Sequence, residues 1–491
     1  MKLKVKLWRW SAGVPVAMLN SKIAQEMGVH ATDRISIKTF EKNSMEFSTV
    51  VDTIGVFVKK NELAISFEIK EILGLREGQI VDVNIAETPR SLIFIKEKLD
   101  KKELSKKKIF EIIEDIVNNS LSEAEVALFI SAMHIHGMNF KEITYLIEAI
   151  LNSGQMISWG KKLIADKHCI GGVAGNRTTP IVVSICAAAG LTIPKTSSRA
   201  ITSAAGTADV MEVAAKVNFN MKEIKSIVKK TNACIVWCGG LGMVPADSKI
   251  IKIEKQLKID PKAQLLASIM SKKLSVGSNH ILIDIPYGKS AKFDKKKALE
   301  LKKDFEKLAK YFKKKMKVVL TDGSQPIGNG IGPRLELIDV IKVLNPEESG
   351  PLDLEEKSIF LSGQLLELTG KAKKGKGEEL ARKILVSGKA FEKFKQIIKA
   401  QNGSLKLKEN GKFKKDIFAK KNMIIKSIHN KKINSLARVV GCPVDKFSGI
   451  YLYNHVGDKV KKGEKLLTIY SESNARLLDA VKFYNEVKPI N

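Results

Sequence analysis

Short runs rich in β-branched residues alternate with helical stretches between about residues 162 and 350. This alternation constrains the fold more than any other feature of the chain. It predicts an α/β sheet whose strands are joined by crossover helices. The strand candidates are residues 191–195, 233–237, 281–285 and 318–320.

Residues 166–180 form a glycine-containing loop ahead of an apolar helix. The segment reads Asp-Lys-His-Cys-Ile-Gly-Gly-Val-Ala-Gly-Asn-Arg-Thr-Thr-Pro. The pair Thr179-Pro180 predicts the start of a helix, with Thr179 as the N-cap and Pro180 as the first helical residue. Free N–H groups and the positive end of the helix dipole meet there, and Lys167 and Arg177 add charge. The loop indicates either a phosphate site or an ordinary strand-to-helix turn, because it has neither the Walker A nor the G-x-G-x-x-G spacing.

The segment 195–212 has the composition of an anion site. It reads Lys-Thr-Ser-Ser-Arg-Ala-Ile-Thr-Ser-Ala-Ala-Gly-Thr-Ala-Asp-Val-Met-Glu. Small residues let backbone N–H groups approach a ligand closely, and Ser198, Ser203 and Thr207 add neutral donors. Arg199 could either clamp a phosphate or brace the loop through one of the two carboxylates that follow.

Five ordered motifs resemble those of the thymidine/pyrimidine-nucleoside phosphorylase family. They are Lys-His-x-x-Gly-Gly-Val at 167–173, Ser-Ser-Arg-Ala…Ala-Gly-Thr-Ala-Asp-Val-Met-Glu at 197–212, Ala-Ser-Ile-Met-Ser-Lys-Lys at 267–273, the strand 281–285, and Thr-Asp-Gly-Ser-Gln-Pro-Ile-Gly at 321–328. Within the family the chain is most similar to the archaeal AMP phosphorylases. Ser-Arg-Ala-Ile-Thr-Ser at 198–203, Ile-Asp-Pro at 259–261 and an additional N-terminal domain carry that similarity.

The resemblance covers essentially the whole chain and implies its reaction. We expect reversible phosphorolysis of AMP to adenine and ribose 1,5-bisphosphate, with CMP and UMP as further candidate substrates. A thymidine-type pyrimidine-nucleoside phosphorylase is the alternative within the family. Phosphate is then a co-substrate, and no cofactor is implied.

The resemblance also implies a type II nucleoside phosphorylase fold, in which a helical domain built from two segments accompanies an α/β domain. The N-terminal residues alternate short β-rich runs with two helical pieces, which predicts a small β-barrel. The C-terminal turn Gly-Asp-x-Val-x-x-Gly-Glu indicates a barrel-sandwich hammerhead without a carrier lysine. We therefore expect a β-barrel over 1–86, a helical domain over 88–160 and 242–277, an α/β domain over 162–241 and 278–404, and an α+β domain over 424–491.

The family's substrate-binding positions fall on both loops and on two later segments. Gln264, Ser268 and Lys272 are spaced i, i+4 and i+8, so they form one stripe along a helix. We interpret this stripe as facing a ligand. Lys292 follows the strand 281–285 and would add a cation. The resemblance implies substrate contacts for Lys167, Gly172, Ser198, Arg199, Ala200, Ile201, Thr202, Ser203, Thr207 and Lys292. The helical stripe adds Ser268 and Lys272.

Asp260 has two interpretations. As the residue before Pro261 it suits the N-cap of the helix that follows. Its family position implies a catalytic role as the proton donor to the departing purine. An asparagine substitution separates the two interpretations, because it keeps the cap and removes the proton donor.

The chain departs from the family pattern at two points. Cys169 stands where the family's Lys-His-Ser supplies a hydroxyl, so a weak donor replaces a good one. Pyrimidine phosphorylases use an arginine before the helix to recognise the base, but no arginine occurs between Arg199 and Arg334. This second departure favours a purine.

A net charge of +31 raises the alternative of a nucleic-acid-binding protein. Only ten of the 84 basic residues are arginine, however, and lysines occur along the whole chain without a recognised nucleic-acid-binding motif. We therefore expect no nucleic-acid partner and interpret the charge as a solvated surface that favours anionic small substrates.

The remaining composition predicts a cytoplasmic enzyme without a metal. No apolar run reaches 18 residues and the N-terminus lacks a signal-peptide core. The five cysteines lack the paired spacing of a zinc site. Because every expected substrate residue lies between 167 and 292, we expect the terminal domains to serve assembly more than chemistry, with at least a homodimer.

Overall fold

The structure is a computed structural model that describes residues 1–8, 15–41, 44–160, 163–200, 203–407, 409 and 411–491. It divides into two compact units. The first unit contains Met1–Gly154 and Pro245–Ser268, and the second contains Gln155–Val244 and Ile269–Asn491.

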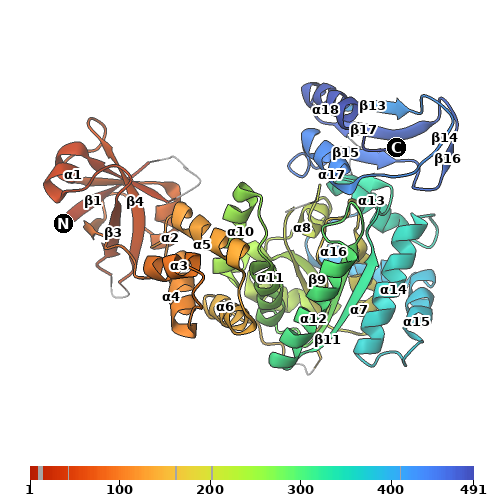
Figure 1. The fold of residues 1–491 in the computed structure, drawn as a ribbon, viewed down its shortest axis with the longest axis horizontal. Coiled ribbons are helices and arrows are strands. Elements are labelled where there is room, and N and C mark those ends of the chain that lie inside the picture. Colours follow the sequence, from red (N-terminus) through yellow and green to blue (C-terminus); the bar gives the residue numbers. More distant parts are fainter. Residues whose placement is uncertain (9–14, 42–43, 161–162, 201–202, 408, 410) are drawn as a thin grey trace. The chain divides into compact units, whose positions relative to one another are not determined.

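Six strands of the first unit close into a barrel with the order β1-β5-β2-β4-β3-β6 (Figure 1). Along β1, Leu3 and Val5 are buried while the lysines beside them are exposed, as expected when alternate side chains face opposite sides of a strand. The predicted small β-barrel is confirmed. The barrel elements are β1 (Lys2–Leu7), β2 (Val16–Asn20), α1 (Ser21–Met27), β3 (Arg34–Thr39), β4 (Glu46–Ile54), β5 (Glu62–Ile65), α2 (Phe67–Leu73) and β6 (Ile80–Ile85).

Helices make up the rest of the first unit. Capping boxes start two of them, with Ser122 and Glu125 at α5 and Asn139 and Glu142 at α6. Glu142 also accepts a hydrogen bond of 2.8 Å from the buried Lys98 ammonium, which ties α3 to α6. These helices are α3 (Ser91–Leu99), α4 (Lys106–Val117), α5 (Glu123–His136), α6 (Phe140–Asn152), α10 (Pro245–Leu257) and the first half of α11 (Lys262–Ser275).

Parallel strands form the centre of the second unit. Strand β10 pairs with β7 on one side and β11 on the other, and β8 pairs with β9. The predicted α/β architecture is confirmed. The prediction that a loop begins at residue 166 is wrong for the first residues of that segment. Asp166 to Cys169 belong to β7, because they pair with β10 residue by residue. The elements are β7 (Ala165–Cys169), α7 (Thr178–Ala188), β8 (Ile193–Ser197), α8 (Thr207–Met211), α9 (Met221–Thr231), β9 (Ala233–Trp237), η1 (Cys238–Gly240), β10 (His280–Tyr287), α12 (Lys295–Tyr311), β11 (Lys315–Asp322), β12 (Gly330–Ile331), α13 (Pro333–Leu344), α14 (Leu352–Leu368), α15 (Gly377–Val386) and α16 (Lys389–Ala400).

The C-terminal residues build a second sheet in the same unit, with the order β12-β15-β17-β13. Because β12 precedes α13 in the chain, this sheet is continuous with the α/β part. Its apolar core also contains Ala174 and Ala204, one residue from each predicted anion loop. The elements are β13 (Phe413–Phe418), β14 (Met423–Ile424), α17 (Asn430–Val439), β15 (Gly449–Leu452), β16 (Lys459–Val460), β17 (Lys465–Ser471) and α18 (Asn474–Val487).

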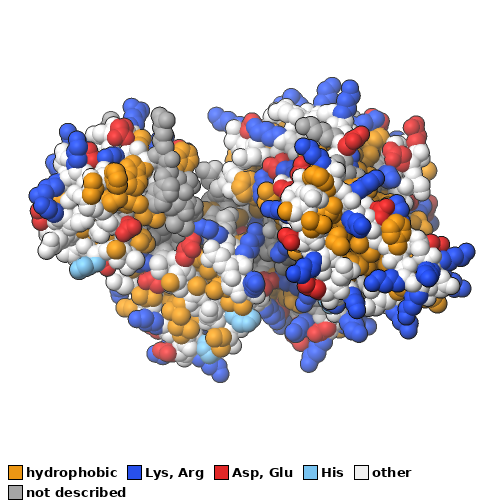
Figure 2. Space-filling model, turned by 90° about the horizontal axis from the view of Figure 1, so that it is seen from above, with side chains coloured by type: hydrophobic (Ala, Val, Ile, Leu, Met, Phe, Trp, Pro, Cys, Tyr) orange, Lys and Arg blue, Asp and Glu red, His pale blue; other side chains and the backbone are white. Residues whose placement is uncertain are grey.

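Figure 2 shows Lys and Arg side chains spread over the visible face, interspersed with acidic and apolar ones. This distribution agrees with the sequence, in which lysines are not confined to one segment. Within the described ranges, no helix combines the length and the apolar character that a membrane crossing requires.

Candidate active site

The glycine loop, residues 170–177, connects β7 to α7. Its glycines Gly171, Gly172 and Gly175 have φ values of +92°, +91° and +67°, which side-chain-bearing residues rarely adopt. Helix α7 begins at Thr178, and its N-cap is Arg177 without a side-chain cap bond. The prediction of Thr179 as the N-cap is therefore wrong.

Lys167 binds both threonines at the start of the helix. Its ammonium donates to the Thr178 hydroxyl at 2.7 Å and to the Thr179 hydroxyl at 3.4 Å. The side chain is fully buried, and this burial lowers the pKa of the Lys167 ammonium. Lys167 thus supports the start of α7 from inside the protein, and each threonine keeps its own O–H to donate.

Cys169 ends β7 next to Lys167. Burial raises the pKa of its thiol to about 11, so the sulfur is uncharged near neutral pH. The Asn176 amide donates to the sulfur at 3.4 Å. A neutral thiol is a weaker donor than a hydroxyl, so Cys169 is a weak hydrogen-bond donor at the end of β7.

Gly172 lies directly against Lys292. A Cβ on Gly172 would come within 2.9 Å of the Lys292 amide nitrogen and of its Cβ. The structure therefore brings these two predicted substrate residues together from the ends of β7 and β10. Lys292 is partly exposed.

The serine loop, residues 198–206, follows β8 and is held by one buried carboxylate. Asp209 accepts hydrogen bonds from the Ala200 N–H at 2.7 Å and the Gly206 N–H at 2.9 Å. The Ser203 hydroxyl donates to the Ala205 carbonyl at 2.7 Å. The predicted substrate residues Ile201 and Thr202 lie outside the described residues.

Arg199 braces the serine loop. Its guanidinium contacts Asp209 at 3.0 Å and donates two hydrogen bonds of 2.7 Å to Glu212. It also stacks over Trp237, with 4.9 Å between the guanidinium carbon and the ring centroid. Of the two sequence interpretations, these contacts correspond to the brace.

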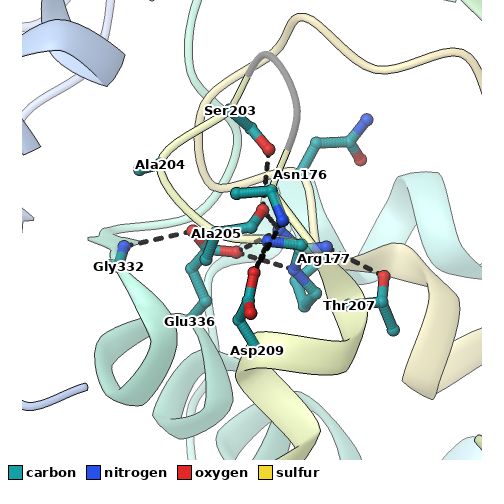
Figure 3. Close-up of polar contacts among 12 residues, drawn as sticks. Asn176, Arg177, Ser203, Ala204, Ala205, Thr207, Asp209, Gly332 and Glu336 are labelled. Atoms are coloured by element: carbon teal, nitrogen blue, oxygen red, sulfur yellow. Dashed lines mark hydrogen bonds and ion pairs between the residues drawn. The ribbon is translucent and has the colours of Figure 1, made fainter. Parts of the chain in front are cut away.

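Arg177 joins the two loops, as Figure 3 shows. Its guanidinium donates to Glu336 at 2.6 Å, to the Thr207 hydroxyl at 2.9 Å and to the Ala205 carbonyl at 2.7 Å. The expectation that Arg177 adds charge to a phosphate site is therefore wrong. Its charge is buried and paired with Glu336, and the guanidinium serves as a structural link.

The predicted residues around α11 belong to both units. Asp260 is exposed and Ser268 is buried, both in the first unit, while Lys272 is partly exposed in the second. Gln264 is fully buried and donates to Asp247 at 3.2 Å. The interpretation of Gln264 as part of a ligand-facing stripe is therefore wrong, because α11 buries that residue against α10.

Two buried charge clusters were not predicted from the sequence. Asp166 accepts from Lys273 at 2.6 Å and lies 3.4 Å from Lys195. Burial lowers the pKa of the Lys273 ammonium, although the Asp166 carboxylate opposes the shift. In the second cluster, Asp284 accepts from Thr321 at 2.6 Å and lies 3.6 Å from the Lys357 ammonium. No local pattern identifies these residues, since their partners come from distant strands and helices.

Among the described residues, no group of three or more His, Cys, Asp or Glu side chains is arranged to hold a metal ion. The two loops are rich in backbone N–H groups and hydroxyls, and Lys292 lies beside the glycine loop. Such donors suit phosphate oxygens.

Comparisons with known proteins find relatives that match the whole chain. The chain is 42% identical to the AMP phosphorylase of Pyrococcus furiosus, with 100% of this chain and 97% of that protein covered. It is 44% identical to the AMP phosphorylase of Methanococcus maripaludis strain C6, with coverages of 99% and 97%. The chain belongs to the AMP phosphorylase family. The resemblance inferred from the motifs is confirmed.

Family models match three parts of this AMP phosphorylase family member. They are the glycosyl transferase family helical bundle domain at residues 93–154, the glycosyl transferase family a/b domain at 161–391, and the pyrimidine nucleoside phosphorylase C-terminal domain at 424–491. The crystal structure of anthranilate phosphoribosyltransferase from Thermus thermophilus has a TM-score of 0.53 at 16% identity, covering 63% of this chain and 99% of that one. That likeness concerns the fold alone.

Proposed function

We propose that the protein cleaves AMP with phosphate to give adenine and ribose 1,5-bisphosphate. The full-length identity of 41–44% to AMP phosphorylases carries this proposal. The site agrees with it, because two loops rich in N–H and O–H donors lie at the ends of neighbouring strands and are joined by Arg177.

In this reaction a phosphate oxygen attacks C1′ of the ribose while the bond from C1′ to N9 of adenine breaks. The electron pair of that bond stays with the base, and a proton delivered to N7 neutralises it. We assign this catalytic role to Asp260. The donors of the loops stabilise the charge of both anions as they are brought together.

We assign the anion contacts to the two loops and to the residues beside them. The residues assigned to these contacts are Gly172, Lys292, Ser198, Ala200, Ile201, Thr202, Ser203, Thr207, Ser268 and Lys272. Arg199 acts through the serine loop that it braces, and Lys167 acts through Thr178 and Thr179.

The second candidate is a pyrimidine-nucleoside phosphorylase. The match of residues 424–491 to the pyrimidine nucleoside phosphorylase C-terminal domain favours it. The absence of arginine from 200–333 speaks against it, because the pyrimidine enzymes use an arginine there to recognise the base.

Product analysis by mass tests the proposal. The purified chain is incubated with phosphate and each of AMP, CMP, UMP, adenosine and thymidine. We expect adenine and ribose 1,5-bisphosphate from AMP, and much slower cleavage of adenosine, because binding of the 5′-phosphate contributes energy at the reacting centre. Equal rates on AMP and adenosine, or cleavage without phosphate, would contradict it.

The remaining assignments follow from this function. We propose a cytoplasmic enzyme that needs no cofactor besides its co-substrate phosphate, forms at least a homodimer, and has the domain boundaries given above from the sequence. Its substrates are then small anions, and no nucleic-acid or membrane partner is involved.

A further inference from the structure

Helix α17, in the C-terminal part of the chain (residues 413–491), contacts both loops through two asparagines one helical turn apart. Asn430 accepts a hydrogen bond of 3.0 Å from the Ala174 N–H in the glycine loop. Asn434 accepts one of 2.9 Å from the Ala204 N–H in the serine loop. Residues at i and i+4 lie on the same face of a helix, so one rigid element binds both loops.

Asn430 also reaches the segment that carries Lys292. Its side-chain amide donates to the Ser290 hydroxyl at 2.9 Å and to the Gly323 carbonyl at 2.9 Å. Ser290 lies two residues before Lys292, and Gly323 directly follows β11. A single buried side chain thus connects the loops that follow β7, β10 and β11.

Burial makes the loss of these hydrogen bonds costly. Asn430 is fully buried and Asn434 is 4% exposed. Ala174 and Ala204, whose N–H groups they bind, contribute their methyl groups to the core of the C-terminal part. A buried N–H that loses its acceptor is costly, so each loop has one strongly preferred position on α17.

We propose that Asn430 and Asn434 are positioning residues that hold the glycine loop and the serine loop at a fixed spacing for the two anions of the reaction. This inference rests on the proposed function. It departs from the expectation that the terminal domains serve assembly more than chemistry. The C-terminal part sets the geometry of the substrate loops without contributing a group to the reaction.

The test uses the full chain with Asn430→Leu and Asn434→Leu, which keep the approximate volume and remove the acceptor. Amide hydrogen exchange is measured on peptides covering 170–176, 203–207 and 321–325. We expect faster exchange of the serine-loop peptide in Asn434→Leu, and of the other two peptides in Asn430→Leu. Asn434→Asp retains an acceptor oxygen and should keep the Ala204 amide protected.

Steady-state kinetics provides the second measurement. We expect KM for AMP and phosphate to rise about tenfold in each leucine variant, the scale of one lost buried hydrogen bond, with a smaller change in kcat. Leu477→Ala is the matched control, because Leu477 belongs to the same core and its side chain makes no hydrogen bond. It should lower Tm and leave KM and loop exchange unchanged.

The outcomes separate the two proposals. Wild-type loop exchange and KM in both leucine variants would overturn the positioning role, as would an equal rise of KM in Leu477→Ala. Failure of the wild-type chain to cleave AMP would overturn the proposed function, whereas the exchange pattern would still decide whether the asparagines hold the loops.

Discussion

Gly172 lies so close to Lys292 that a Cβ would stand 2.9 Å from the Lys292 amide nitrogen. We expect Gly172→Ala to push the two segments apart, because its φ of +91° also disfavours any side chain. A displacement of ~1 Å would lower kcat/KM for phosphate by about 10²-fold. Gly242→Ala is the control, since Gly242 has a φ of +59° but no atom within 4 Å of a Cβ. Equal activity losses in both variants would mean that the contact with Lys292 is unimportant.

Cys169→Ser should improve the site. The thiol is neutral, with its pKa raised to about 11, and is a weak donor. A hydroxyl there would add one hydrogen bond and lower KM for phosphate by about 2- to 12-fold, the range expected for one net hydrogen bond. Phosphate titrations of the initial rate measure this, with Cys169→Ala as the control without a donor. A serine variant no better than the alanine variant would show that Cys169 does not face phosphate.

Asp260→Asn separates catalysis from helix capping. An amide caps a helix as well as a carboxylate does but cannot donate a catalytic proton. We expect kcat to fall by about 10²–10⁴-fold while Tm stays near the wild-type value. Steady-state assays and thermal unfolding measure the two quantities. Near-normal turnover would leave Asp260 with a structural role only.

Glu212 should make stability depend on pH. Hydrogen bonds from Arg199, with further contributions from Lys446, lower its pKa to about 2. A carboxyl whose folded pKa is depressed stabilises the fold above its ordinary pKa of 4.5, and this stabilisation is lost as pH falls from 4.5 towards 2. The Tm of Glu212→Gln should therefore lie below that of the wild type at about pH 7, and the gap should narrow as pH falls through this window. A Tm difference that does not depend on pH would indicate that the ion pairs of Glu212 contribute nothing to stability.

Removal of residues 1–84 tests the role of the N-terminal barrel. None of the proposed substrate residues lies in the barrel, so we expect the truncated chain to cleave AMP and to form at least a dimer. Light scattering and product analysis measure both properties. A folded dimer without activity would show that the barrel contributes to the site.

The sequence by itself determined the architecture and the position of the two loops. Short β-branched runs predict parallel strands because burial on both faces requires apolar residues there, and clustered glycines predict loops because only they adopt φ values such as +91° at Gly172 without strain. These are local requirements, so a few neighbouring residues suffice to express them. The family motifs depend in the same way on consecutive residues.

Only the tertiary structure decided what each polar side chain contacts. The sequence suggested that Arg177 adds charge to a phosphate site, but Glu336, far along the chain, neutralises it in the interior. Asn430 and Asn434 belong to none of the motifs described from the sequence, yet folding places them against Ala174 and Ala204. The reason is physical: a buried polar group needs a partner, and the partner comes from whichever distant segment the packing of the core brings next to it.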